Sequence, residues 1–239
     1  MATAQQHYDQ LLASIYVWMA GGVEAALAAG TQDVAPLVPG TGLAIDLGAG
    51  FGMHAIPLAR GGYDVLALDT SRELLDVLRA NAEGLRIRAL EADLLDFRRH
   101  APAPAALIVC MGDTLTHLAS TDDVERLASD VAASLAPSGR FVTTFRDYTK
   151  PAAGDARFIP VRSDANRIHT CVLEEHPDHM QVHDIVHERD GAAWRMRVSS
   201  YPKLRLAPAA VAETLRYAGL ETTVAPGARG MVRITAVRA

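Results

Sequence analysis

Cysteine and lysine are both scarce in this 239-residue sequence. The two cysteines, Cys110 and Cys171, are far apart and each lies in an apolar run, so neither a disulfide framework nor a four-ligand zinc site is indicated. Lys150 and Lys203 are the only lysines, and the formal net charge is −5 at pH 7. Proteins that bind nucleic acids through phosphates carry a clustered excess of basic residues. Nucleic acid is therefore not expected as a partner.

Long hydrophobic runs are absent as well. The longest apolar stretch, residues 11–30, is interrupted by Gly21, Gly22 and Glu24, and no basic segment precedes it. A membrane-spanning helix needs about 20 consecutive apolar residues, and a secretory signal has a basic segment before its apolar part. We therefore expect no membrane partner, no export and a cytoplasmic location.

Short apolar runs alternate with helical patterns from residue 42 onward. Strands are expected at residues 43–47, 65–68, 87–90, 106–111 and 141–145, and helices at 52–60, 71–82 and 121–136. Strands that alternate with helices predict βαβ units and a parallel sheet. Ahead of them, the apolar spacing of residues 4–29 predicts a leading helical segment.

The pattern changes after Pro151. Alternating segments separated by turn-prone sequences predict an inserted antiparallel meander, with strands at 157–162, 168–174, 180–188 and 193–204. A helix at 207–219 and two antiparallel strands at 220–225 and 231–237 then resume the sheet. The predicted fold class is α/β, with a doubly wound, mostly parallel seven-stranded sheet, an N-terminal helical segment and the inserted antiparallel β meander.

The loop that leaves the first expected strand is Gly48-Ala49-Gly50-Phe51-Gly52. In an open parallel sheet, ligands bind beyond the carboxyl ends of the strands, and glycines let the backbone turn sharply and approach a ligand. Asp69 ends the second expected strand, where a carboxylate can accept hydrogen bonds from both ribose hydroxyls. These features fit any adenosine-containing cofactor.

The spacing of the glycines narrows the choice of cofactor. A dinucleotide fingerprint reads G-x-G-x-x-G, whereas this loop reads G-x-G-x-G and is preceded by Asp46. A carboxylate there would repel a pyrophosphate, but it suits the cationic ammonium of a methionyl group, directly or through water. A dehydrogenase that binds a nicotinamide dinucleotide is therefore disfavoured.

With these residues the sequence resembles the class I S-adenosylmethionine-dependent methyltransferases. Asp46–Gly52 corresponds to their first motif, Asp69 to their second-strand acid, and Glu91-Ala92-Asp93-Leu94 to the segment after their third strand. The resemblance implies a Rossmann-like S-adenosylmethionine-binding domain made of residues 41–150 and 206–239, a helical lid at 1–40 and a substrate or lid subdomain at 151–205. The cofactor-binding residues expected in the Rossmann-like domain are Asp46, Gly48, Ala49, Gly50, Gly52, Asp69, Thr70, Asp93, Leu94, Met111 and Gly112.

A narrower similarity is to small-molecule enzymes of the glycine N-methyltransferase kind. The segment from Tyr8 to Met19 is similar to the leading helix that closes over their cofactor, so Tyr16 and Trp18 are expected as cofactor contacts or, equally, as core-facing aromatics. Residues 111–118 and 145–148 are similar to their segments after the fourth and fifth strands. Asp113 stands where an asparagine is common in them, so an amino-acid substrate does not carry over.

Methyl transfer from a sulfonium is an in-line displacement, and it needs a general base only if the acceptor arrives protonated. His117 is the first candidate for that base and Asp113 the second, although a histidine at position 117 also fits a loop or helix surface. The residues expected to bind substrate are Arg146, Tyr148 and Tyr201. Arg146 could hold a carboxylate bidentately, or it could form an ion pair with Asp147 or Asp113.

Five histidines gather in the expected meander, at positions 169, 176, 179, 183 and 187. His183 and His187 would lie roughly 13 Å apart along a strand, which is too far to share one ion. We interpret the five as solvated strand histidines and expect no metal. The meander is expected to cover the mouth of the cleft, with Tyr201 and Trp194 lining the acceptor pocket.

The sequence thus predicts an S-adenosylmethionine-dependent methyltransferase that acts on a nitrogen or oxygen nucleophile of a small molecule. Two alternatives remain. One is a nucleic-acid or protein methyltransferase, although the Asn/Asp-Pro-Pro-aromatic segment typical of the nucleic-acid enzymes is absent after the fourth expected strand. The other is a protein that binds the cofactor without catalysis. A homodimer is left open.

Overall fold

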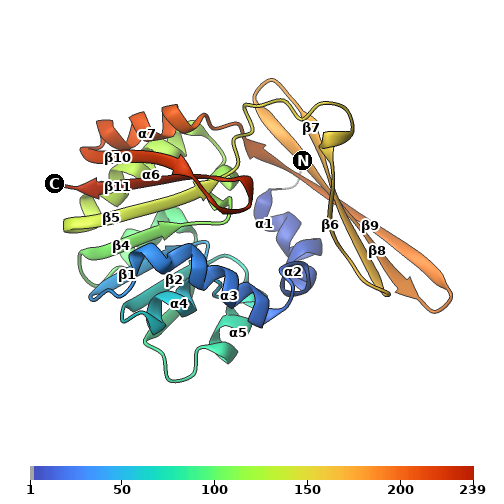
Figure 1. The fold of residues 1–239 in the computed structure, drawn as a ribbon, viewed down its shortest axis with the longest axis horizontal. Helices are drawn as coiled ribbons and strands as arrows, with labels where there is room; N and C mark the ends of the chain where they lie inside the picture. Colours follow the sequence, from blue (N-terminus) through green and yellow to red (C-terminus); the bar gives the residue numbers. More distant parts are fainter. Residues whose placement is uncertain (1–2) are drawn as a thin grey trace.

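A seven-stranded sheet forms the body of the molecule in the computed structural model, which describes residues 3–239 (Figure 1). The strand order is β10-β11-β5-β4-β1-β2-β3, in which β11 is antiparallel to both of its neighbours and the other pairs are parallel. The strands are β1 (Leu43–Leu47), β2 (Asp64–Asp69), β3 (Ile87–Glu91), β4 (Ala105–Cys110), β5 (Leu135–Phe145), β10 (Leu220–Pro226) and β11 (Val232–Arg238). The predicted fold class is confirmed.

Helices cover both faces of this sheet because its central strands are apolar on both sides. In β4, Leu107 and Val109 join one buried cluster while Ile108 and Cys110 join the other. The first cluster includes side chains of α3 (Val23–Val34), α4 (Ala55–Arg60) and α5 (Arg72–Asn81), and the second includes those of α6 (Thr121–Ser134) and α7 (Pro208–Tyr217). The chain order reverses at β1, which lies between β2 and β4, so the carboxyl end of β1 faces the crevice where open α/β sheets bind ligands.

The leading segment is bent rather than continuous. It consists of α1 (Ala4–His7), a π-helical turn η1 (Tyr8–Leu12) and α2 (Ala13–Met19), and it breaks before α3. Gly21 and Gly22 both have φ of 92°, a conformation that glycine adopts without strain. In residues 3–239 no single helix is long and apolar enough to cross a membrane. Ala4–Met19 and Val23–Leu37 meet the length and composition criteria only when taken together, and the chain bends by 80° between them.

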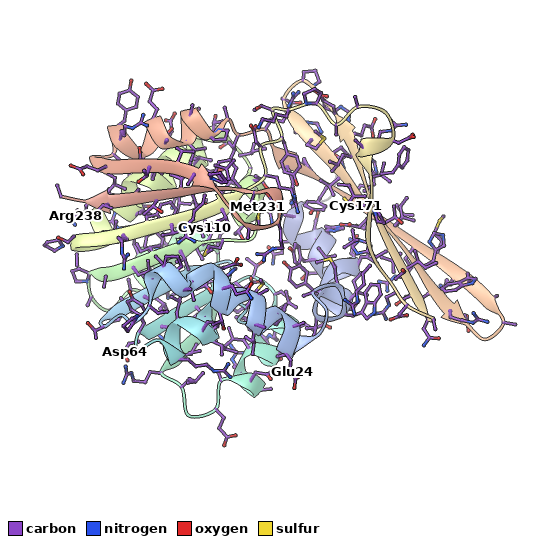
Figure 2. All side chains as sticks on the ribbon, in the orientation of Figure 1. Glu24, Asp64, Cys110, Cys171, Met231 and Arg238 are labelled. Atoms are coloured by element: carbon purple, nitrogen blue, oxygen red, sulfur yellow. The ribbon has the colours of Figure 1, made fainter. Side chains whose placement is uncertain are left out.

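The second sheet is the antiparallel meander expected after Pro151. It has the order β6-β7-β8-β9, with β6 (Phe158–Ser163), β7 (Arg167–Glu175), β8 (His179–Asp190) and β9 (Ala193–Leu204). Figure 1 shows α1 and α2 between this sheet and the body of the molecule. Cys110 and Cys171 lie in different sheets (Figure 2), and both are free thiols.

The element boundaries differ most from the sequence prediction at β5 and α4. The helix expected at 121–136 ends at Ser134, and β5 begins at Leu135 instead of 141, because Pro137 cannot donate within a helix and restricts the residue before it. The helix expected at 52–60 begins only at Ala55, since residues 51–54 form a turn. The division into a lid, a cofactor domain and an inserted subdomain stays a prediction.

The interpretation of His169 as a solvated strand residue is wrong. Its side chain is 2% exposed, and its Nε2 lies 2.7 Å from Asp184 Oδ1. The opposite oxygen of Asp184 lies 2.9 Å from Nε2 of His7 in α1, whose ring stacks on Tyr201 of β9 with 4.1 Å between centroids. A buried His-Asp-His cluster therefore joins the leading segment to the second sheet.

Candidate active site

The glycine-rich loop begins where β1 ends and packs tightly against the segment after β4. Gly48 has φ of 76°, and a Cβ on it would clash with the side chain of Thr114. The N–H groups of Gly48 and Ala49 both donate to the carbonyl oxygen of Leu68 at 2.9 Å, which ties the loop to the end of β2. The predicted need for glycine thus has a steric cause at this position.

Asp69 faces the loop from the end of β2. Its Oδ2 accepts the N–H of Gly50 at 2.7 Å, and its Oδ1 accepts the N–H of Ser71 at 2.8 Å. Burial raises the pKa of Asp69, although these backbone donors oppose the increase. Each oxygen accepts one backbone hydrogen bond and keeps a lone pair for a ligand hydroxyl.

Asp46 lies beneath the loop, 1% exposed, and within residues 3–239 neither carboxylate oxygen has a partner at hydrogen-bonding geometry, although the backbone N–H of Ala55 opposes the rise in its pKa. Burial raises the pKa of Asp46 to about 6, with the nearby Asp69 adding to the effect and His54 opposing it. A buried carboxylate without partners is costly unless a donor or cation satisfies it. This environment fits the predicted cationic group of the ligand, reached through water, because Asp46 does not line the cleft directly.

A cleft of about 370 Å³ runs along the carboxyl ends of β1, β2 and β4. It is large enough for a small organic ligand. It brings together many residues expected at the cofactor site, together with His117. These are Tyr16, Gly48, Ala49, Gly50, Asp69, Thr70, Asp93, Leu94, Met111, Gly112 and His117.

Trp18 does not take the expected position at the cofactor. Its indole N–H donates to Asp164 at 2.5 Å, and the guanidinium groups of Arg162 and Arg167 lie over its ring. The side chain therefore fastens α2 to the turn between β6 and β7, outside the cleft. Gly52 also lies off the cleft wall, because a Cβ on it would press against Leu78 and Ile56.

The carboxylate of Asp113 already accepts hydrogen bonds from three groups of the protein. The donors are the backbone N–H of Arg146 at 2.9 Å, the hydroxyl of Tyr148 at 2.8 Å and the ammonium of Lys203. Burial would raise the pKa of Asp113, but the Lys203 charge and the hydrogen bonds hold it below its ordinary value. A carboxylate stabilised in this way is a poor proton acceptor, so its expected role as a general base does not fit.

His117 lines the cleft, and its Nε2 has no hydrogen-bond partner among the described residues. The ring lies 5.9 Å from that of Tyr8 and 5.5 Å from that of Tyr201, centroid to centroid. Burial and the Lys203 charge lower the pKa of His117 to about 3. The imidazole is therefore neutral at pH 7 and can accept a hydrogen bond, but it is too weak a base to take a proton from an ammonium.

The residues expected to bind substrate lie behind the cleft wall. Arg146 donates from Nη1 to the carbonyl oxygen of Arg229 at 3.1 Å, instead of pairing with Asp147 or with the carboxylate of Asp113. Tyr148 and Tyr201 are 6% and 4% exposed and do not line the cleft. Trp194 is exposed near the β8–β9 hairpin, outside the cleft, so its expected place in the acceptor pocket is not supported.

Tyr8 and Lys203 are absent from the expected site residues. Tyr8 lines the cleft and packs against Tyr16, with 5.7 Å between ring centroids. The eight-residue interval between these tyrosines, close to two helical turns, is a signal that could have paired them. Lys203 had no local signal, because its partner Asp113 lies 90 positions away in the chain.

Comparison with known proteins agrees with this geometry. Residues 44–139 match the family model described as a methyltransferase domain. Over 106 residues the chain is 28% identical to a glycine/sarcosine N-methyltransferase of Aphanothece halophytica, an alignment that covers 44% of this chain and 40% of the relative. The chain thus spans less than half the length of that relative.

Two solved structures share the fold over nearly the whole chain. The CcbJ methyltransferase of Streptomyces caelestis superposes with a TM-score of 0.79 and 22% identity, covering 98% of both chains. The sugar N-methyltransferase KedS8 of Streptoalloteichus sp. superposes with a TM-score of 0.76 and 16% identity, covering 94% of this chain and 92% of that one. These two structures show that the fold is shared, and the match of residues 44–139 to the methyltransferase-domain model supports the resemblance to S-adenosylmethionine-dependent methyltransferases.

Proposed function

We propose that the protein is an S-adenosylmethionine-dependent methyltransferase that methylates a nitrogen or oxygen nucleophile of a small molecule by in-line displacement. The observation that carries this proposal is the arrangement of Asp69, the glycine-rich loop and Asp93 on one cleft, with the unpartnered Asp46 beneath it. Each of these features suits a different part of one ligand.

The free lone pairs of Asp69 would bind the ribose hydroxyls. Asp93, whose side chain accepts the N–H of Leu95 at 2.8 Å, would bind the adenine amino group together with the backbone of Leu94. Asp46 would balance the ammonium of the methionyl part. When bound, S-adenosylmethionine supplies a methyl group activated by a positively charged sulfur.

Nitrogen is the favoured nucleophile of the two. The relative from Aphanothece halophytica and the structural neighbour KedS8 are both named as N-methyltransferases, the first of glycine or sarcosine and the second of a sugar. The neutral imidazole of His117 would then orient the acceptor by accepting one of its N–H groups. The leading segment and the second sheet would serve as the lid, and the homodimer stays a prediction that light scattering would test.

Formation of S-adenosylhomocysteine tests the proposal. Purified protein is incubated with S-adenosylmethionine and pooled small-molecule amines and alcohols, and with peptide and RNA in separate reactions. We expect product only with the small molecules, and a lower rate from protein carrying Asp69→Ala at S-adenosylmethionine concentrations that do not saturate it. Turnover restricted to peptide or RNA would favour the nucleic-acid or protein alternative. Cofactor binding without turnover in any reaction would identify a non-catalytic binding protein.

A further inference from the structure

The cleft wall next to the second sheet is made of aromatic side chains without charge. Tyr8, Tyr16 and His117 form this wall, and Tyr201 supports His117 from behind. Burial raises the pKa of both Tyr8 and Tyr16, so their phenols stay protonated, and the pKa of His117 is low enough to keep its ring neutral. These groups can accept or donate hydrogen bonds, but they cannot balance an anion.

Cationic side chains are missing from the cleft. Among residues 3–239, no lysine or arginine lines it. The charged residues that do line it are acidic, namely Asp69, Asp93 and Asp123. His54 also lines the cleft, but its Nε2 lies 3.3 Å from Asp33 Oδ2, so it has its own partner. Asp69 and Asp93 are the residues proposed to hold the cofactor, so the acceptor faces the side of Tyr8, Tyr16 and His117, where no described side chain could balance a negative charge.

Neither Arg146 nor Lys203, which both bond to Asp113, lines the cleft. Arg146 donates to the carbonyl oxygen of Arg229, away from the cleft. Lys203 is 7% exposed and bonds to the carboxylate of Asp113, which balances its charge behind His117. Asp113 itself stands between Gly112 and Thr114, which both line the cleft, while its own side chain faces Lys203. Asp113, in the loop after β4, thus neutralises the Lys203 charge that would otherwise be available to a ligand next to His117.

Building on the proposed function, we propose that the acceptor is an amine without a carboxylate near its nitrogen, and that Asp113 sets this specificity by neutralising Lys203. A buried carboxylate on the acceptor would lack a counter-charge and would pay its full desolvation cost. An amine that carries hydroxyl or amide groups meets no such penalty, because phenols and imidazole can satisfy those groups.

The reaction step is balanced with the neutral amine as the reactant. The amine nitrogen uses its lone pair to bond to the methyl carbon, and the carbon–sulfur bond breaks with its electron pair left on sulfur. The methylated ammonium that results then releases one proton to water. His117 acts as a hydrogen-bond acceptor that positions the amine, so no side chain needs to store the proton.

Matched acceptor pairs test the proposal, each pair differing in one carboxylate: glycinamide and glycine, serinol and serine, and D-glucosamine and D-glucosaminic acid. Initial rates of S-adenosylhomocysteine formation are measured with the full chain at saturating S-adenosylmethionine. We expect turnover in at least one pair, with kcat/KM, calculated per unprotonated amine, at least about tenfold higher for the member without the carboxylate. Equal or higher kcat/KM for the acids would overturn the proposal, as would no turnover in any pair by protein that binds S-adenosylhomocysteine.

Calorimetric titration with S-adenosylhomocysteine distinguishes failure of the acceptor proposal from failure of the proposed function. In the first case the protein binds S-adenosylhomocysteine, and in the second it does not. The variant Asp113→Asn leaves the charge of Lys203 without its counter-ion. We expect the ratio of kcat/KM between the member without the carboxylate and its acid to fall at least threefold in this variant. Asp147→Asn is the matched control, because within residues 3–239 the Asp147 side chain bonds only to its neighbours Thr149 and Lys150, and the variant should keep the rate ratio of the natural protein. An unchanged ratio in a folded Asp113→Asn protein would contradict the role of Asp113. If that variant does not fold, the acceptor pairs measured with the natural protein decide the proposal.

Discussion

At the scale of single residues, the cofactor site depends on two carboxylates in opposite situations. Asp69 is supported by two backbone N–H groups, whereas the buried oxygens of Asp46 have no partner at hydrogen-bonding geometry among the described residues. The first is ready to accept further hydrogen bonds, and the second requires a compensating charge. Substitution of each should therefore affect binding and stability differently.

Replacing Asp69 with alanine should weaken the binding of S-adenosylhomocysteine at least about tenfold, which corresponds to roughly 1.4 kcal/mol of charge-assisted hydrogen bonding. Part of the loss comes through the loop, because Gly50 also loses its acceptor. Asp64→Ala is the control: Asp64 begins the same strand and pairs with Arg86 at the surface (Figure 2). Calorimetric titration measures both variants, and an unchanged affinity of Asp69→Ala would contradict the assignment of the site.

Replacing Asp46 with asparagine should stabilise the ligand-free protein at pH 7.5 while weakening cofactor binding. The folded-state pKa of Asp46, about 6, lies above the ordinary value of 3.8, so ionisation costs stability as pH rises between these values. The difference between these two pKa values corresponds to a loss of unfolding free energy of at most about 3 kcal/mol. The gain in unfolding free energy of Asp46→Asn should therefore be largest above pH 6 and disappear near pH 4. Urea unfolding at several pH values measures this, and a gain that is the same at pH 4 and pH 7.5 would contradict it.

At the scale of elements, the loop after β1 is constrained by contact with the loop after β4. Gly48→Ala should lower the unfolding free energy by about 2–4 kcal/mol, because it combines a positive φ with a clash against Thr114. Gly84→Ala is a matched control, since Gly84 has φ of 74° but open space around its Cα. It should cost only about 1–2 kcal/mol. Denaturant unfolding compares the two, and equal losses would show that the contact with Thr114 is unimportant.

The His7–Asp184–His169 cluster holds the leading segment against the second sheet. His7→Ala should lower stability by about 2–4 kcal/mol and speed amide hydrogen exchange in residues 4–12, because it leaves the buried Asp184 with one partner fewer. His183→Ala is the control: His183 also contacts a serine and a carboxylate, Ser200 and Glu174, but at a more exposed position. Its loss should be at most about 1 kcal/mol. Similar exchange rates in the two variants would contradict a fastening role for His7.

The site residues that sequence could predict are those placed by local geometry. Asp69 and Asp93 follow parallel strands whose carboxyl ends meet at one edge of a sheet, so the strand pattern alone brings them together. Lys203 reaches Asp113, and Asp184 reaches His7, only through the packing of the second sheet against the loop after β4 and the leading segment. No periodicity encodes contacts between such distant segments, which is why Asp113 and His117 were expected to be bases and Trp18 a cofactor contact.

At the scale of the whole molecule, the cleft lies between the loops of the seven-stranded sheet and the leading segment. The seven-stranded sheet is packed on both faces and supplies the loops after β1, β2 and β4. The leading segment supplies Tyr8 and Tyr16, and the second sheet holds that segment in place. The proposed cofactor end of the cleft thus belongs to the sheet, and the proposed acceptor end depends on the packing of the leading segment against the second sheet.

The proposal that the cleft binds S-adenosylmethionine is tested by calorimetric titration of the natural protein with S-adenosylhomocysteine and, separately, with a nicotinamide dinucleotide. The Asp46 carboxylate and the glycine spacing favour a methionyl ligand over a pyrophosphate. We expect one site for S-adenosylhomocysteine with a Kd below about 100 μM, equivalent to a binding free energy more favourable than about −5.5 kcal/mol, and no heat from the dinucleotide. Binding of the dinucleotide, or no binding of S-adenosylhomocysteine at millimolar concentration, would contradict the account.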